Sequence, residues 1–349
     1  MKSVIRNQAA LMLATFDDLG TMLAELPGPD EETARAARER DTQLTKPPGS
    51  LARLEDIAAW MAGWQGVHPP RADDILVLVF AGNHGVAAHG VSAFPPEVTA
   101  QMVANFAAGG AAINQICRAV GARLNVHALD LDNPTADFTE APAMSAAECR
   151  AAVAFGMDKV PDNADLLCVG EMGIGNTTVA ATICLALFGG DAEDWVGPGT
   201  GIDRDARRRK VRAASAAIAT HGAVLDDPLQ VMRRLGGREL AAIAGAVLAA
   251  RHKRIPVILD GFVACAAVAP LHVARPGALD HCLAGHRSAE PGHGRLLDRL
   301  GKTAVLDLGM GLGEASGAAL AAAVVKAAVA THGGMATFAE AGVSAKGDS

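Results

Sequence analysis

Five short runs of apolar residues, separated by long Ala-rich segments, constrain most strongly how this chain of 349 residues can fold. Each run is nearly free of polar residues, which is typical of a central parallel strand covered by helices on both faces. The segments between the runs have the apolar spacing of helices, and this alternation indicates βαβ units. We therefore predict a doubly wound α/β fold with a mostly parallel sheet and helices on both faces. The predicted strands are residues 75–80, 124–128, 166–169, 257–259 and 304–308.

The two ends of the chain are predicted to form a small helical lobe beside the sheet. Residues 31–65 have helical patterns on both sides of TKPPGS, where two prolines and a glycine interrupt a helix. An Ala-rich segment at 315–332 predicts a long helix after the last strand. We expect an α/β domain at 66–314, which binds nucleotide and base, and a lobe made of 1–65 and 315–349.

Composition disfavours several kinds of partner. The chain has 31 Lys plus Arg against 38 Asp plus Glu, and a net charge of -7 argues against nucleic acid. The longest uncharged apolar stretch, residues 240–250, is shorter than the ~20 residues that span a bilayer, so no membrane partner is expected. The six cysteines form no CxxC pair. They are expected to be reduced thiols in a cytoplasmic protein.

Gly-rich polar turns follow four of the predicted strands. Parallel strands end at a common edge of the sheet, and ligands bind at that edge in open α/β folds. The four turns are therefore expected to line one crevice. They are AGNHG at 81, GEMGIGNTT at 170, DG at 260 and DLGMGLGEASG at 307.

The turn GEMGIGNTT has the features of a phosphate cradle. Gly173 and Gly175 allow a positive φ or a close backbone approach, and Asn176 or Thr177 is predicted to cap the helix that follows. No Lys follows the second Gly, so a P-loop for nucleoside triphosphates is disfavoured. The alternative is an ordinary strand-to-helix turn without a ligand.

The turn GMGLGEASG places Glu314 just before a predicted helix. It fits the spacing GxGxxG poorly and follows the last strand, whereas a dinucleotide fingerprint follows the first. Glu314 is therefore a candidate catalytic carboxylate. The alternative is a negative charge that stabilises the helix through its dipole.

Three further motifs offer candidate ligands. In RDARRRK, Asp203 just before the motif is a predicted helix cap, and Lys210 either turns inward to a phosphate or lies on a solvated face. GHRSAEPGH at 285 places Ser288 near a helix start, a further anion contact. His84 has no carboxylate at metal-ligand spacing and HExxH is missing, so no metal site is predicted.

Taken together, seven motifs closely resemble those of the nicotinate-nucleotide:dimethylbenzimidazole phosphoribosyltransferase family. They occur in order from about residue 45 to the end of the chain. The motifs are TKPPGSLARLE at 45, GNHGVAAHGVSAFPPEVTAQMV at 82, NFAAGGAAIN at 105, GEMGIGNTTVAA at 170, GPGTGID at 197, GHRSAEPGH at 285 and LGMGLGEASGAAL at 308.

The resemblance implies transfer of the phosphoribosyl group of nicotinate mononucleotide to a benzimidazole, with inversion at the anomeric carbon. It implies Glu314 as the general base, a homodimer of Rossmann-like subunits, small-molecule substrates, and no cofactor or metal. The implied phosphate and ribose contacts are Glu171, Gly173, Gly175, Asn176, Thr177, Lys210, Ser288 and Ala289. The implied base pocket contains His84, Met172, Leu312 and Gly313.

Two departures from the family pattern concern the base pocket. Asn83 stands where the family commonly has Asp, and Pro96 where it commonly has Gln. The identity of the accepted base is therefore left open. Two other classes of protein fit the sequence less well. An NAD-dependent dehydrogenase would need GxGxxG after the first strand, which GNHGV does not provide. A noncatalytic nucleotide-binding module would have no use for Glu314.

Overall fold

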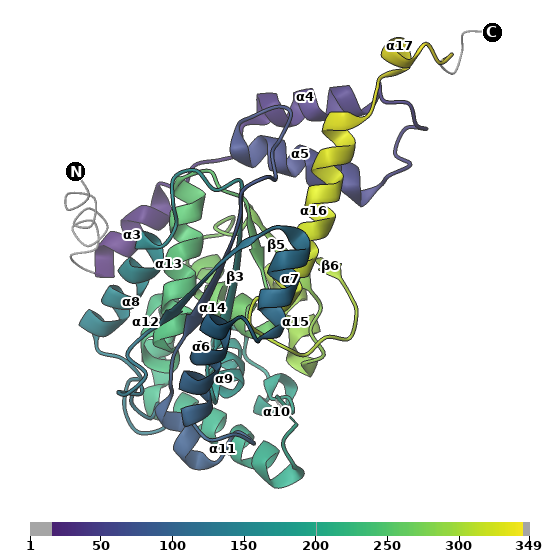
Figure 1. Ribbon diagram of the computed structural model, residues 1–349. Coiled ribbons are helices and arrows are strands. Elements are labelled where there is room, and N and C mark those ends of the chain that lie inside the picture. The colour runs from purple at the N-terminus through teal and green to yellow at the C-terminus, as the bar shows by residue number, and fades with distance from the viewer. Residues whose placement is uncertain (1–15, 200, 345–349) are drawn as a thin grey trace, which may run out of the picture.

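Six strands form one parallel sheet at the centre of the computed structural model, which describes residues 16–199 and 201–344 (Figure 1). Their order is β2-β1-β3-β4-β5-β6, and every neighbouring pair is parallel. The order reverses between β1 and β3, which makes this the topological switch point. The predicted doubly wound α/β fold is confirmed. The strands are β1 (Ile75–Ala81), β2 (Arg123–Ala128), β3 (Leu166–Met172), β4 (Val257–Leu259), β5 (Cys282–His286) and β6 (Ala304–Leu306).

The sequence prediction missed β5 and ended β3 too early. The sequence of β5, CLAGH, contains a glycine and a histidine and so lacks the apolar run expected of a central strand. Gly285 is required there because an added Cβ would lie 2.9 Å from the Cα atom of Ala318. β3 continues through Gly170, Glu171 and Met172, which had been assigned to the following turn. Glu171 is thus held by strand pairing opposite Phe80.

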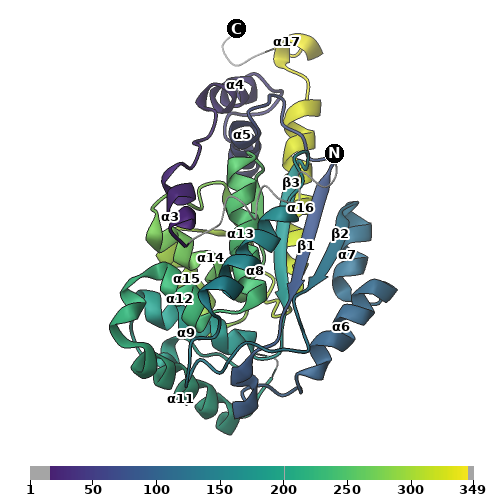
Figure 2. The same cartoon turned by 90° about the vertical axis from the view of Figure 1, so that its left-hand side faces the viewer.

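Helices cover both faces of the sheet, and alternate residues of β1 enter two different cores. Leu76 and Phe80 pack in one core, whereas Ile75 and Val79 pack in the other. Figure 2 shows α6 and α7 beside β2, with α8 and α13 on the other side of β1. The helices of the first core include α8 (Ala146–Asp158), α9 (Asn176–Phe188), α12 (Pro228–Leu235), α13 (Arg238–His252), α14 (Phe262–Ala274) and α15 (Pro291–Leu300). Those of the second include α5 (Arg53–Gln65), α7 (Ala112–Val120) and α16 (Ser316–Gly334).

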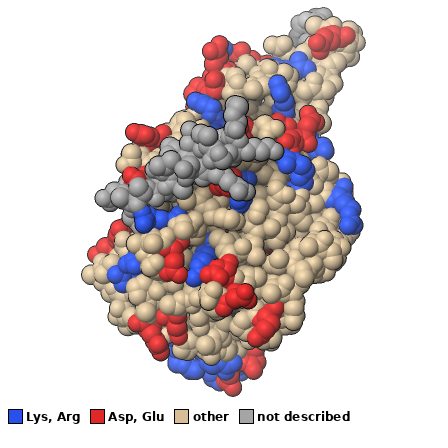
Figure 3. Space-filling model, turned by 60° about the vertical axis from the view of Figure 1, so that its left-hand side comes forward, with Lys and Arg blue, Asp and Glu red and all other residues tan. Residues whose placement is uncertain are grey.

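The remaining elements complete this framework, and α3, α6, α10 and α11 also contribute buried residues to the two cores. On the face drawn in Figure 3, acidic and basic side chains are interspersed rather than gathered by sign. The remaining elements are α3 (Phe16–Ala24), η1 (Gly85–His89), α6 (Glu97–Ala108), α10 (Ala192–Trp195), α11 (Arg204–His221) and η2 (Gly222–Asp226).

Helices from the two chain ends lie together above the sheet (Figure 1). They are α4 (Glu31–Asp41), α5, the end of α16, and α17 (Phe338–Ala341). Arg40 of α4 donates hydrogen bonds to the carbonyl oxygens of His332, at 3.2 Å, and Met335, at 3.0 Å. This contact closes the end of α16 against the N-terminal helices.

We retain the division into an α/β domain at 66–314 and a lobe of 1–65 and 315–349 as a proposal. Residues 1–15 and 345–349 of that lobe lie outside the described residues. The start of α16 belongs to the second core of the sheet, since Ala318 and Ala322 are fully buried there. Among the described helices, α16 is long and apolar enough to cross a membrane, and half of its apolar window is buried in the structure.

The helix pair α8 and α13 depends on two glycines at its crossing. A Cβ on Gly156 of α8 would collide with the carbonyl oxygen of Ala242, and a Cβ on Gly245 of α13 would collide with that of Val153. The two backbones are therefore in direct contact, and neither position has room for a methyl group.

Gly245→Ala is expected to lower the free energy of unfolding by about 1–3 kcal/mol, the usual cost of overpacking a core. Equilibrium urea unfolding would measure this change. Gly333→Ala on α16 is the matched control, because the nearest atom to its added Cβ is 3.9 Å away. Equal stability of the two variants would contradict the proposed backbone contact.

Candidate active site

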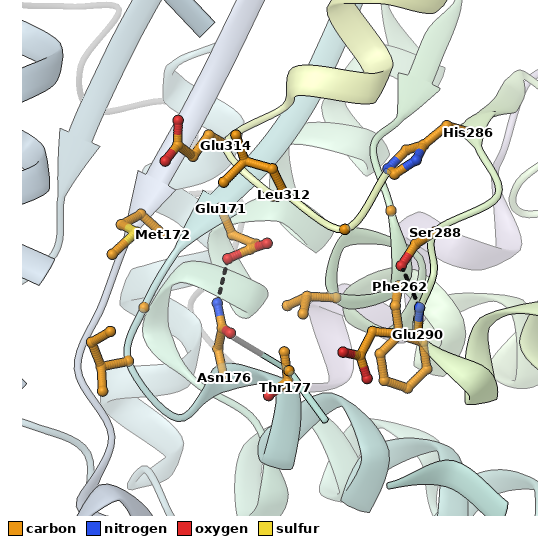
Figure 4. Close-up of a pocket in the computed structure, with 17 residues that line it drawn as sticks. Glu171, Met172, Asn176, Thr177, Phe262, His286, Ser288, Glu290, Leu312 and Glu314 are labelled. Carbon is orange, nitrogen blue, oxygen red and sulfur yellow. Dashed lines mark hydrogen bonds between the residues drawn. The ribbon is translucent and has the colours of Figure 1, made fainter. Parts of the chain in front are cut away.

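A cavity with an empty volume of about 690 Å³ opens at the carboxyl ends of β3, β4, β5 and β6 (Figure 4). Three of the four Gly-rich turns predicted to share an edge contribute to its wall. The lining residues are Glu171, Met172, Gly173, Ile174, Asn176, Thr177, Gly199, Gly261, Phe262, Val263, His286, Ser288, Glu290, Gly311, Leu312, Gly313 and Glu314.

Glu171 stands at the end of β3 and is 8% exposed. The side-chain amide of Asn176 donates a hydrogen bond to its Oε2 atom, as Figure 4 shows. Burial, followed by the charges of Asp260 and Glu239, raises the pKa of Glu171 to about 8, whereas the Asn176 hydrogen bond lowers it. Glu171 therefore holds its proton more tightly than an ordinary glutamate.

The N-terminus of α9 faces the cavity without a side-chain cap. Gly175 is the N-cap residue with a φ of 93°, so the predicted cap by Asn176 or Thr177 is wrong. The Asn176 side chain bonds to Glu171, and Thr177 Oγ1 accepts a hydrogen bond from Lys210. A helix N-terminus left open in this way is suited to bind an anion.

Lys210 is buried behind the start of α9. The side chain of Asp203 caps α11 by accepting from the Ala206 N–H at 2.7 Å, as predicted, and this starts the helix that carries Lys210. Lys210 is 2% exposed and its Nζ donates to Thr177 Oγ1 at 2.7 Å. Burial lowers its pKa to about 8. The solvated-face alternative thus describes Arg204 and other basic neighbours on α11, but not Lys210.

Glu314 lies in the loop between β6 and α16, beside Leu312 (Figure 4). Its backbone N–H donates to the Glu171 carbonyl oxygen at 3.1 Å, and its φ is 64°. The side chain is 6% exposed, and burial raises its pKa. Oε2 has no hydrogen-bond partner among the described residues. A charge that stabilises the dipole of α16 would be expected in the first turn of that helix. Because α16 begins only at Ser316, Glu314 lies before this turn.

The opposite wall of the cavity comes from β5 and the turn after it. Ser288 Oγ accepts from the N–H of Glu290 at 3.1 Å, and the Ser288 N–H donates to Nδ1 of His293 at 2.9 Å. His286 is 1% exposed and fits between Gly261 and Gly317. Burial lowers the pKa of His286, so the neutral imidazole faces the cavity.

Nine of the predicted site residues line the cavity, and the other four lie outside its wall. Gly175 caps α9, Lys210 bonds to Thr177, and the Ala289 N–H bonds to the Met310 carbonyl at 2.8 Å. His84 pairs with Glu239 at 2.6 Å and adjoins Gly173. The nine residues in the wall are Glu171, Met172, Gly173, Asn176, Thr177, Ser288, Leu312, Gly313 and Glu314.

Four polar residues at this site were not predicted from the sequence. Asp260, His286 and Glu290 stand in motifs singled out above, but no role was assigned to them. A carboxylate directly after a strand, as in the DG turn at 260, was the available signal for Asp260. No sequence signal was available for Glu239, because its hydrogen-bond partner, His84, lies 155 residues away in the sequence.

The two departures from the family pattern lie near the η1 segment. Asn83 is buried, and its side-chain amide donates to the Leu131 carbonyl at 3.0 Å. Pro96 is the N-cap residue of α6. Among the described residues, no group of three or more His, Cys, Asp or Glu side chains is placed to hold a metal ion.

Comparisons of sequence and of structure with known proteins identify relatives of the same name. A family model described as phosphoribosyltransferase matches residues 26–343. The nicotinate-nucleotide–dimethylbenzimidazole phosphoribosyltransferase of Rhizobium etli is 62% identical over 331 residues, which are 95% of this chain and 98% of that protein. That of Brucella anthropi is 60% identical over 329 residues, covering 94% and 97%.

A crystal structure of the enzyme of the same name from Thermus thermophilus superposes with a TM-score of 0.83 at 41% identity, covering 91% of this chain and all of that one. The matches extend over the sheet, the cavity and the helices of both chain ends. The chain therefore belongs to the family of nicotinate-nucleotide–dimethylbenzimidazole phosphoribosyltransferases.

Proposed function

We propose that this protein transfers the phosphoribosyl group of nicotinate mononucleotide to 5,6-dimethylbenzimidazole, which yields nicotinate and α-ribazole 5'-phosphate. The observation that carries the proposal is one cavity with an open helix N-terminus at one end and two buried carboxylates, Glu171 and Glu314, at the other. The names of the relatives support the two substrates.

The phosphate and ribose of the nucleotide are assigned to the α9 end of the cavity. The positive end of the α9 dipole, the Thr177 hydroxyl and the Lys210 ammonium supply positive charge and donors for a phosphate. Gly173 and Gly175 add no side chain to this turn, and the turn at Ser288 and Ala289 closes the other side. Glu171 and Asn176, which are hydrogen-bonded to each other, are assigned to the ribose.

Glu314 is assigned as the general base. In nicotinate mononucleotide the ring nitrogen bonded to the ribose is a cationic pyridinium. When that bond breaks, nicotinate departs with a neutral ring, so it needs no proton. The attacking benzimidazole must lose the proton on its second nitrogen to give a neutral product. One carboxylate suffices for this step, and Oε2 of Glu314 has no partner among the described residues that would compete for the proton. A positioned base typically accelerates a reaction 10²- to 10⁴-fold.

Attack from the face opposite the leaving group would convert the β-nucleotide into an α-nucleotide. The anomeric carbon passes through a state with oxocarbenium character, which a nearby negative charge stabilises. Glu171 is assigned to this role in its ionised form. Burial raises the pKa of Glu171 to about 8, so this role belongs to the fraction of molecules in which Glu171 is ionised. The hydrogen bond from Asn176 favours that fraction, because it lowers the pKa.

The base pocket is assigned to Met172, Leu312 and Gly313, with His84 behind the turn at Gly173. Leu312 is 46% exposed, which leaves an apolar surface at this end of the cavity. An added Cβ on Gly313 would lie 2.5 Å from Oε1 of Glu171, so any side chain there would displace that carboxylate. Asn83 and Pro96 neighbour this region, so a competition assay among benzimidazole, adenine and phenolic bases is the way to find the natural acceptor.

We also infer a cytoplasmic homodimer that acts without a metal or other cofactor and without nucleic acid. Incubation of nicotinate mononucleotide with dimethylbenzimidazole, followed by HPLC, tests the reaction directly. Nicotinate and α-ribazole 5'-phosphate should form at the same rate with and without EDTA. A noncatalytic nucleotide-binding module would release no nicotinate.

Glu314→Gln is expected to lower kcat about 10²- to 10⁴-fold while nicotinate mononucleotide binds as before, because the amide keeps the shape but does not accept the proton. Steady-state kinetics and calorimetric binding would measure the two effects. Unchanged turnover would remove Glu314 from the mechanism.

Gly175→Val is expected to raise the Kd for nicotinate mononucleotide strongly and, unlike Glu314→Gln, to act on binding. A valine is strained at a φ of 93°, and its Cβ would lie 3.6 Å from Ala87 on one side and displace the anion on the other. Equal loss of binding in the two variants, both folded by circular dichroism, would overturn the separation of roles.

The pH dependence of kcat should have its acid limb above the pKa of an ordinary glutamate. The base acts only when ionised, and burial raises the pKa of Glu314, so turnover is lost as the pH falls through that raised value. A pH–rate profile of Glu171→Gln is the control, since this variant lacks the other buried glutamate of the cavity. Loss of the acid limb in that variant would assign the titration to Glu171 instead.

A further inference from the structure

Glu290 lies at the phosphate end of the cavity, yet its carboxylate has no role in the function proposed above. It is the N-cap residue of α15, and Ser288 Oγ accepts a hydrogen bond from its N–H. Figure 4 shows the carboxylate directed across the cavity towards Thr177. Its Oε2 atom is buried and has no hydrogen-bond partner among the described residues.

The loop at Gly197 and Gly199 brings this carboxylate close to Lys210. A Cβ on Gly197 would collide with Oε2 of Glu290, while the Gly197 carbonyl accepts from Lys210 Nζ at 3.5 Å. A Cβ on Gly199 would lie 2.9 Å from Lys210 Nζ and 3.1 Å from Thr177 Oγ1. The Gly199 N–H in turn bonds to Glu290. A carboxylate, an ammonium and a hydroxyl thus enclose one small volume.

The charges in this volume do not balance when a phosphate enters it. A phosphate monoester carries about -1.5 to -2 charges at pH 7. Among the described residues that line the cavity or contact Thr177, Lys210 is the one cation. An ionised Glu290 would therefore add a second anion next to the phosphate, and nearby like charges favour the protonated form.

Burial already raises the pKa of Glu290, and the charge of Lys210 lowers it. The other titratable groups around the cavity do not relieve the repulsion. Glu171 and Glu314 are acidic, and burial lowers the pKa of His286 and brings that of His293 to about 3, so both histidines are neutral at pH 7.

We propose that Glu290 takes up one proton from solvent when the nucleotide binds, and that the resulting O–H donates a hydrogen bond to the substrate phosphate. The proposal rests on the assignment of the phosphate to α9 and Lys210. The O–H bond on Glu290 is the one bond formed, and the proton comes from the buffer. Affinity for the nucleotide therefore falls as the pH rises, by up to about tenfold per pH unit.

Calorimetric titration of nicotinate mononucleotide at pH 7, in two buffers of different ionisation enthalpy, counts the protons taken up. The unaltered protein should take up about one proton more than Glu290→Gln, which has no carboxyl group to protonate. Between pH 7 and 8 its Kd should rise by up to about tenfold relative to that variant. A purely structural role of Glu290 would move neither quantity.

Three controls separate Glu290 from its neighbours. Lys210, with a pKa of about 8, is mostly protonated at pH 7, so Lys210→Met should weaken binding but keep the proton uptake. Glu193→Gln, the same change at an exposed site on α10, should behave like the unaltered protein. Nicotinate riboside, which lacks the phosphate, should bind with no uptake that depends on Glu290.

Equal proton uptake by the unaltered protein and Glu290→Gln would overturn the proposal. If Glu290→Gln does not fold, an uptake below about half a proton by the unaltered protein at pH 7 overturns it as well. Failure of the proposed function has a different signature: the protein would neither bind nicotinate mononucleotide nor release nicotinate from it.

Discussion

The buried carboxylate of Asp260 is the interaction on which the geometry of the cavity depends. α16 has alanine at its N-cap and hence no side-chain acceptor of its own for its first amides. Asp260, directly after β4, supplies that acceptor: its Oδ1 receives the Ala318 N–H at 2.9 Å, and the residue is 1% exposed. Burial raises its pKa to about 7, while the backbone amides favour the ionised form. This cap fixes the start of α16 over the sheet and with it the loop that holds Glu314.

Close backbone contact completes what the cap begins. A Cβ on Gly170 would collide with the backbone of Ala315, and one on Gly317 would collide with the ring of His286. The chain contains only 3% aromatic residues, and small side chains let α16 lie directly on β3 and β5. The separation of Glu171 and Glu314 is therefore set by main-chain contact rather than by flexible side chains. Such support is what holds a catalytic group within a narrow range of positions.

The two ends of the cavity differ in electrostatic character in a way that suits a transfer reaction. One end offers amides, a hydroxyl and the Lys210 ammonium; the other offers carboxylates that burial makes more basic than usual. A group transfer needs the phosphate held while a proton is removed elsewhere, so separate ends serve separate steps. Glu290 departs from this division, because it is an acid at the anion-binding end. Its protonation would restore the balance of charge there.

The sequence by itself determined the α/β class, the five apolar strands, the common edge of the Gly-rich turns and nine residues of the cavity wall. Local apolar spacing and turn chemistry carry the strands and the common edge, whereas several wall residues, such as Glu171, Met172 and Leu312, were implied by the resemblance of the motifs to the family. Tertiary structure alone decided that CLAGH forms β5, that Lys210 turns inward, and that Gly175 rather than Asn176 caps α9. It also paired His84 with Glu239 and α16 with Asp260. These features depend on contacts between residues far apart in the chain, where a buried polar group finds its partner only after the backbone has folded.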